Sequence, residues 1–257
     1  MRSATILMSA LILAGLISLS ETTYADQGWQ KLPQGELTVK WWQWLYTIPV
    51  SQNPAYDPTG GNAFVAQPYS DLLFLVGTLA PPIGLPTGDI LGKATRAITV
   101  KKGTAFFFPI INTEWDSVCR RPNLGGDCFG LPKYPNNLSI PQLQALAAAS
   151  TDAATDLYVS LTSSTTRIDT PPTMSRLKSF PQAFPYKLPA TDNIYQSQGI
   201  NFSGTVAPAV GDGYYSLIPG NLPPGQYQLK FGGKGPLDNA GHYFILDITY
   251  NITILSN

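Results

Sequence analysis

The 257-residue sequence has one histidine, two cysteines and few charged residues, and each shortage excludes a class of function. A zinc site needs several ligands of the imidazole or thiolate kind, which His242 alone cannot supply, and a Ser-His-Asp triad would have to use this residue. The chain also has no Gly-x-Ser-x-Gly elbow, no G-x-x-x-x-G-K-[ST] loop and no G-x-G-x-x-G turn. We therefore expect no metal and no cofactor, and we interpret His242 as a hydrogen-bonded residue at the start of a strand.

Charge of one sign is also missing. Lys and Arg total 16, Asp and Glu total 16, and charged residues make up 12% of the chain. Without a basic excess the chain cannot neutralise phosphates, so nucleic acid is not an expected partner. The surface must then be covered by small polar residues and Tyr. Such a surface suits neutral, hydroxyl-rich ligands, although it is equally common in secreted β proteins that bind none.

The one long hydrophobic run lies at the start of the chain. Residues 1–25 contain an early Arg2, an apolar stretch and small residues ending at Ala25, which is the pattern of a signal peptide. An uncleaved anchor is the alternative, but the apolar stretch is only about 16 residues, against the roughly 20 of a spanning helix. We expect residues 26–257 to form a single domain, secreted, periplasmic or on the cell surface, with no membrane span after cleavage.

Proline and glycine, 23 of each, are spread along the chain between short segments rich in aromatic and β-branched residues. This pattern predicts a mainly β fold, an antiparallel β-sandwich of jelly-roll or immunoglobulin-like type with two short helices. The helices are expected at residues 38–48, capped by Thr38, and 140–149, capped by Ser139. Strands are expected at residues 72–77, 97–100, 105–111, 156–161, 214–217, 227–231 and 243–254.

Two kinds of strand pattern can be distinguished. Residues 226–231 alternate, which places Tyr227, Leu229 and Phe231 on one buried face. In contrast, residues 106–108 and 244–246 are apolar at every position, so we expect both segments in the centre of a two-layer structure.

Carboxylates are the remaining candidates for catalysis. Glu114 and Asp116 follow the apolar segment 105–111 and stand beside Asn112 and Trp115, which we take as candidate binding residues. A glycosidase uses two carboxylates with an aromatic ring nearby, so this segment could supply part of such a site. The alternative is a polar turn after a core strand.

Three tryptophans in four residues mark the first helix. At about 100° per residue, Trp42 and Tyr46 point away from the face formed by Trp41 and Leu45. If exposed, Trp42 and Tyr46 would offer flat surfaces to a sugar or peptide; the alternative is that all the rings are buried. In the following loop, Asp57 could bind Ca²⁺ or cap a turn.

Several of these segments recur together in a known family. They include Trp42-Gln43-Trp44, Asn53-Pro54, Phe107-Phe108-Pro109, Asp212-Gly213-Tyr214 and Leu222-Pro223-Pro224-Gly225. In this respect the chain resembles a family of exported bacterial and archaeal proteins without an established activity. The resemblance implies export and one domain, and it supplies no catalytic residue. Relatives often carry cysteines where this chain has Ala63 and Ala97, which implies that these two positions are spatial neighbours.

These observations favour an exported binding or surface-associated module, with neutral glycan or another envelope component as partner. A secreted, carboxylate-based hydrolase of the glycosidase kind is the alternative function. A structural envelope protein whose sheet edges pair with other chains is a further alternative.

Cys119 and Cys128 enclose a short segment with Pro and Gly-Gly, and in an exported chain we predict a disulfide between them. Closing such a loop is worth about 2–3 kcal/mol. A metal-binding or nucleophilic role is the minority alternative. Mass spectrometry of protein from the exported fraction should find the two residues linked, and two free thiols would contradict the prediction.

Overall fold

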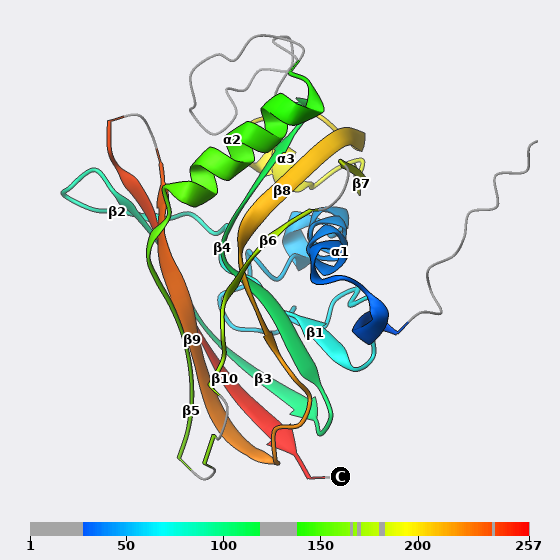
Figure 1. Ribbon diagram of the computed structural model, residues 1–257, viewed down its shortest axis with the longest axis vertical. Coiled ribbons are helices and arrows are strands. Elements are labelled where there is room, and N and C mark those ends of the chain that lie inside the picture. The colour runs from blue at the N-terminus through cyan, green and yellow to red at the C-terminus, as the bar shows by residue number, and fades with distance from the viewer. Residues whose placement is uncertain are drawn as a thin grey trace, which may run out of the picture.

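The computed structural model describes residues 28–118, 138–164, 167–168, 171–179, 183–237 and 240–256. The predicted signal peptide, Cys119 and Cys128 lie outside these ranges. The described residues form ten strands in two sheets and three α-helices, so the expected mainly β sandwich with short helices is confirmed (Figure 1). No described helix is long and apolar enough to cross a membrane.

The first sheet, sheet A, has the strand order β1-β4-β8-β6, and β7 also pairs with β8. Its strands are β1 (Leu72–Phe74), β4 (Ala105–Asp116), β6 (Ser175–Lys178), β7 (Phe184–Leu188) and β8 (Gly204–Ile218). The pairing of β1 with β4 is parallel, whereas the other pairings in sheet A are antiparallel.

The second sheet, sheet B, has the strand order β2-β3-β10-β9-β5. Its strands are β2 (Ile83–Gly84), β3 (Ile90–Lys101), β5 (Thr155–Ser163), β9 (Gly225–Pro236) and β10 (Tyr243–Leu255). Strands β3 and β10 pair in parallel over twelve residues. With the parallel pairing of β1 and β4 in sheet A, both sheets are mixed, which corrects the expected antiparallel arrangement.

The three consecutive phenylalanines of β4 show why sheet A is covered on both faces. Phe106 and Phe108 face sheet B and pack in the core between the sheets. Phe107 points the opposite way into a second core under α1 (Gln34–Thr47). The expected central position of this segment is confirmed. Phe244 and Ile245 are only half-buried, which corrects the matching expectation for residues 244–246.

Helix α1 begins earlier than predicted, at Gln34, with Pro33 at the N-cap. Thr38 is therefore not a cap; it lies buried inside the helix, where its hydroxyl donates to the carbonyl of Gly35. All the aromatic rings of the helix are buried: Trp41, Trp42, Trp44 and Tyr46 are 3–7% exposed. The alternative of exposed stacking rings on this helix is wrong.

The second predicted helix is confirmed as α2 (Ile140–Asp152), which starts as expected at Ser139. The N-cap forms a capping box in which the side chain of Gln142 accepts from the backbone N–H of Ser139. The short strands β2, β6 and β7 and the one-turn helix α3 (Ile194–Ser197) were not predicted. Each is too short to leave a periodic pattern in the sequence.

Arg96 of β3 joins the loop before β1 to sheet B. Its side chain is buried, with 1% exposure of the residue, and its Nε donates to the carbonyl of Asp57 at 2.7 Å. Its Nη1 donates to the carbonyl of Val76 at 3.0 Å and to the hydroxyl of Tyr250 at 3.2 Å. The backbone N–H of the next residue, Ala97, donates to Thr59. The segment from Asp57 to Thr59, which precedes Ala63, is thus held against β3.

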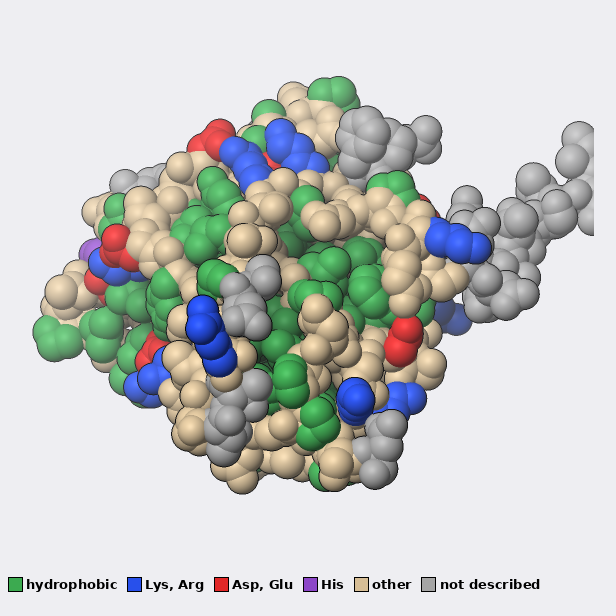
Figure 2. All heavy atoms as spheres, turned by 60° about the horizontal axis from the view of Figure 1, so that its bottom comes forward, with side chains coloured by type: hydrophobic (Ala, Val, Ile, Leu, Met, Phe, Trp, Pro, Cys, Tyr) green, Lys and Arg blue, Asp and Glu red, His purple; other side chains and the backbone are tan. Residues whose placement is uncertain are grey.

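Seen from the lower end of the molecule, basic and acidic side chains are few and lie mainly around the rim, with both signs present (Figure 2). Hydrophobic side chains gather in the middle of this view, inside a rim of polar atoms. This face therefore presents no field of one sign, in agreement with the balanced composition.

Arg96→Met should lower the free energy of unfolding by about 1–3 kcal/mol, because the partly buried carbonyl of Asp57 loses its donor and the buried Val76 carbonyl and Tyr250 hydroxyl each lose a hydrogen bond. Urea denaturation measures this change. The matched control is Thr95→Ala at the neighbouring exposed position, where a change within about 0.5 kcal/mol is expected. Equal stability of Arg96→Met and the wild type would show that the guanidinium does not hold the loop.

Candidate functional site

Four of the residues singled out in the sequence meet in one place. Glu114 and Asp116 occupy alternate positions of β4, so their side chains share one face of the strand. Trp42 and Tyr46 lie one turn apart on α1 and stack, with ring centroids 5.4 Å apart. The hydroxyl of Tyr46 donates to Glu114 Oε2 at 3.2 Å, which joins the helix to the strand.

The other three candidate residues, Asn112, Trp115 and Asp57, make other contacts. Asn112 donates through Nδ2 to the hydroxyl of Tyr215 at 3.2 Å. Trp115 points to the other face of β4 and packs with Leu143 of α2 in a small separate core. These two side chains are thus used in packing and hydrogen bonding within the fold.

Asp57 caps a turn. Its carboxylate accepts from the backbone N–H groups of Thr59 at 2.8 Å, Gly60 at 3.0 Å and Asn62 at 2.8 Å. Partial burial alone would raise the pKa of Asp57, but these hydrogen bonds outweigh it and lower the pKa. Among the described residues no group of three or more His, Cys, Asp or Glu could hold a metal ion. Of the two readings of Asp57, the geometry favours the turn.

Two tyrosines that the sequence did not indicate complete the group around Glu114. Tyr186 of β7 donates to Asp116 Oδ2 at 2.7 Å and stacks on Tyr46 at 4.3 Å. Tyr195 of α3 also donates to Asp116 Oδ2. We call Glu114, Asp116, Tyr46, Tyr186 and Tyr195 the carboxyl–tyrosine cluster.

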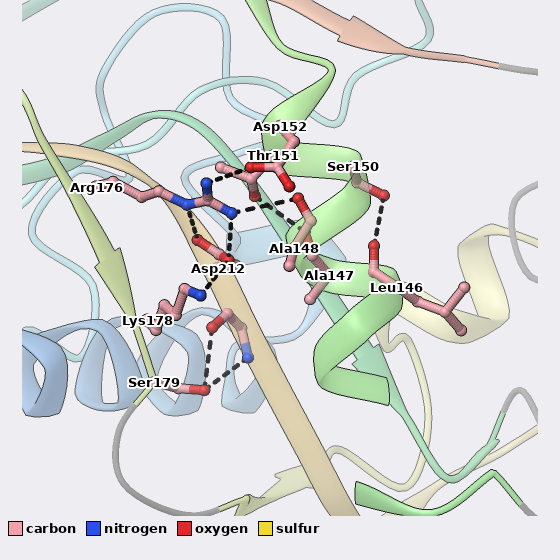
Figure 3. A network of polar contacts seen from close by, with 11 residues as sticks. Leu146, Ala147, Ala148, Ser150, Thr151, Asp152, Arg176, Lys178, Ser179 and Asp212 are labelled. Atoms are coloured by element: carbon pink, nitrogen blue, oxygen red, sulfur yellow. Dashed lines mark hydrogen bonds and ion pairs between the residues drawn. The ribbon is translucent and has the colours of Figure 1, made fainter. Parts of the chain in front are cut away.

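The neighbouring strand β8 is shaped to accept the tryptophan beside this cluster. Gly211 lies opposite Glu114 in the register, and a Cβ there would lie 2.8 Å from Trp42 Nε1. The hydroxyl of Ser179 accepts from the backbone N–H of Gly211 at 2.7 Å (Figure 3). A glycine is therefore required at position 211 to let the ring of Trp42 approach β8.

An ion-pair network fixes α2 beside Gly211. Arg176 of β6 binds both carboxylate oxygens of Asp212, at 3.0 and 2.9 Å. It also pairs with Asp152 at the end of α2 and donates to the carbonyl of Ala148, as Figure 3 shows. Strands β6 and β8 and helix α2 are thus joined by one guanidinium.

Burial gives Glu114 the properties of an acid that keeps its proton. Removal from water raises the pKa of Glu114 well above its ordinary value, and the charge of Asp116 raises it further. Hydrogen bonds from Tyr46 and Tyr186 oppose this shift without cancelling it. Oε1 of Glu114 is buried without a hydrogen-bond partner among the described residues.

The carboxyl–tyrosine cluster is better suited to holding the fold together than to turning over a substrate. Its tyrosines link α1, β7 and α3 to β4 through the two carboxyl groups. A glycosidase needs both carboxyl groups at a cleft that admits the sugar. Two hollows of about 500 and 330 Å³ open on the described part of the chain, and neither is lined by Glu114 or Asp116.

The outer face of sheet B offers a second and more accessible site. Pairing aligns Tyr158 of β5, Gly232 of β9, Asp247 of β10 and Lys93 of β3 in one row across the strands. Tyr158 donates to Asp247 Oδ1 at 3.0 Å, so its side chain crosses β9 over Gly232. Partial burial and this hydrogen bond raise the pKa of Tyr158 to about 12. The ring remains 37% exposed.

A groove of about 500 Å³ crosses the same face near the C-terminal end of β5. Thr162, Gln228, Asn251 and Ala97 form one row across it, about 13 Å along the strand from the row of Tyr158. The next row holds Gln226, Thr253 and Thr99. The Nε2 of Gln228 donates to Asn251 Oδ1 at 3.2 Å. We call this site the sheet B groove; the described residues that line it carry hydroxyl and amide groups and include no Asp, Glu, Lys, Arg or His.

The sequence pattern predicted which side chains of β9 face outward in this groove, but it did not indicate that they line a hollow. The alternation in residues 226–231 correctly places Tyr227, Leu229 and Phe231 in the core, so Gln226 and Gln228 point outward. The alignment of Gln228 with Asn251 follows from strand pairing, which no local pattern reveals.

Comparisons with protein-family models, with curated proteins and with solved structures found no match. The function is therefore argued from the residues of this chain.

The free energy of unfolding should fall as pH rises above the ordinary pKa of a glutamate, about 4.3. The folded state holds the Glu114 proton to higher pH than the unfolded chain, so this contribution is fully present at low pH and is lost as pH rises through the raised folded pKa. Glu114→Gln keeps the shape without the ionisation. It should therefore unfold with a flatter pH profile and be more stable than the wild type at pH 8.

Urea denaturation at pH 4, 6 and 8 measures this profile. Glu36→Gln in the first turn of α1 is the control and should keep the wild-type slope. A Glu114→Gln protein that loses stability with pH as steeply as the wild type would contradict the assignment of the proton to Glu114.

Proposed function

We propose that the protein is an exported β-sandwich module that binds a neutral glycan on the outer face of sheet B. The observation that carries the proposal is the sheet B groove, an exposed hollow lined by hydroxyl and amide side chains without charged groups. Export rests on residues 1–25 of the sequence.

The groove offers the groups that sugar hydroxyls require. A sugar hydroxyl both donates and accepts a hydrogen bond, and the amides of Gln226, Gln228 and Asn251 do the same. Thr99, Thr162 and Thr253 add hydroxyl groups that can rotate to suit either role. No charged group has to be desolvated when a neutral ligand enters, which keeps the cost of binding low.

Tyr158 adds an aromatic surface to the same face of the sheet. Its hydrogen bond to Asp247, which in turn pairs with Lys93 at 3.0 Å, fixes the ring across Gly232. The C–H groups of a sugar ring are apolar and pack well on such a ring. A ligand that reaches from the groove to Tyr158 would lie along β5 and β9.

The protein should be retained by at least one polysaccharide in a panel of insoluble β-glucan, xylan, mannan, starch and chitin. Gln228→Ala and Asn251→Ala should each weaken retention by roughly 2-fold to 12-fold, because one net hydrogen bond is worth about 0.5–1.5 kcal/mol. Affinity gel electrophoresis with the soluble form of the retained polysaccharide measures the change.

Gln144→Ala, on the exposed side of α2, is the matched control and should bind like the wild type. If the wild type binds none of the polysaccharides, the proposal is overturned. The same incubations report on hydrolysis: release of reducing ends that stops in Glu114→Gln would favour the hydrolase alternative instead.

A further inference from the structure

The sheet B groove does not end at β3, the last of the four strands that it crosses. Thr99 of β3 lines this groove and also lines a second hollow of about 330 Å³ around the edge of the strand. The second hollow is lined by apolar Phe64, Tyr69, Leu72, Leu73 and Val100 and by polar Gln67, Ser70, Thr99, Lys101 and Thr104. We call it the edge hollow. The two hollows therefore adjoin at one residue.

Phe64 is an exposed aromatic residue in the lining of the edge hollow. It is 52% exposed, whereas Phe74, Phe106, Phe107 and Phe108 are at most 1% exposed. The ring lines the edge hollow together with Tyr69, Leu72, Leu73 and Val100, so it belongs to a contiguous apolar lining, which is typical of a ligand-binding groove.

The loop that carries Phe64 is held in place by hydrogen bonds from both sides. Trp44 Nε1 donates to the carbonyl of Val65 at 3.0 Å. The amide of Gln67 donates to Ala63 and to Phe74, at 2.7 and 3.0 Å, and accepts from the backbone N–H of Phe74 at 2.9 Å. The ring is thus displayed on a pre-ordered loop, which reduces the entropy lost when a ligand packs on it.

We infer that the edge hollow is the terminal subsite of the sheet B groove and that Phe64 is its stacking surface for one sugar ring. This inference rests on the proposed function and adds the class of ligand to it. A ligand that fills both hollows crosses four strands, about 14 Å between the outer two, and then passes the edge of β3. It must be a chain of several sugar units rather than a monosaccharide or disaccharide.

Calorimetric titration with oligosaccharides of increasing length, cut from the polysaccharide that retains the protein, tests the subsite. Affinity should rise with chain length until the edge hollow is filled. For the longest oligosaccharide, Phe64→Ala should lower the affinity about tenfold, equivalent to about 1.4 kcal/mol. For the shortest oligosaccharide it should leave the affinity unchanged. Phe64→Tyr should restore the affinity for the longest oligosaccharide, because the ring is kept.

Ile83→Ala is the matched control, since Ile83 is 57% exposed on β2 and lines neither hollow. If Asn251→Ala weakens binding while Phe64→Ala does not change it at any length, the subsite is refuted and the proposed function stands. If the wild type binds none of the oligosaccharides, both are refuted. Equal melting temperatures for Phe64→Ala and the wild type would assign the effect to contact rather than to folding.

Discussion

The fold depends on one buried guanidinium. Arg96 and Tyr250 are direct partners in the parallel pairing of β3 with β10, two strands that are distant in the sequence. The guanidinium lies 5.4 Å from the centre of the Tyr250 ring. It donates to the carbonyls of Asp57 and Val76, which come before and after β1 in the sequence. Through these contacts one side chain holds the segments before and after β1 against β3 and β10.

The second constraint is that sheet A is buried on both faces. Its outer face needs a cover, which α1 supplies with its buried tryptophans, and this cover brings Tyr46 against Glu114. Carboxyl groups that are removed from water must either stay protonated or accept hydrogen bonds. In the carboxyl–tyrosine cluster the raised pKa of Glu114 favours its protonated form, and Asp116 accepts hydrogen bonds from Tyr186 and Tyr195. Among the described residues nothing comparable covers the outer face of sheet B, and its exposed rows are correspondingly polar.

The sequence predicted what depends on local pattern. The apolar run at Phe106–Phe108, the alternation in β9 and the cap at Ser139 each determine the placement of their own segment, and the structure agrees. The start of α1 was missed because its first turn is polar and follows Pro33, which gives no apolar period. Tyr186 and Tyr195 were missed because their partner, Asp116, is at least 70 residues away. The parallel pairing of β3 with β10 was missed for the same reason, because strand register depends on both strands and cannot be read from one of them alone.

The side chains that line the sheet B groove are uncharged, and this determines how binding there would respond to salt. Salt weakens attraction between charges, with a screening length of about 8 Å at physiological ionic strength. A groove of hydroxyl and amide groups contains no such attraction to screen. The affinity of this groove for a neutral ligand would therefore be nearly the same in dilute and in saline water.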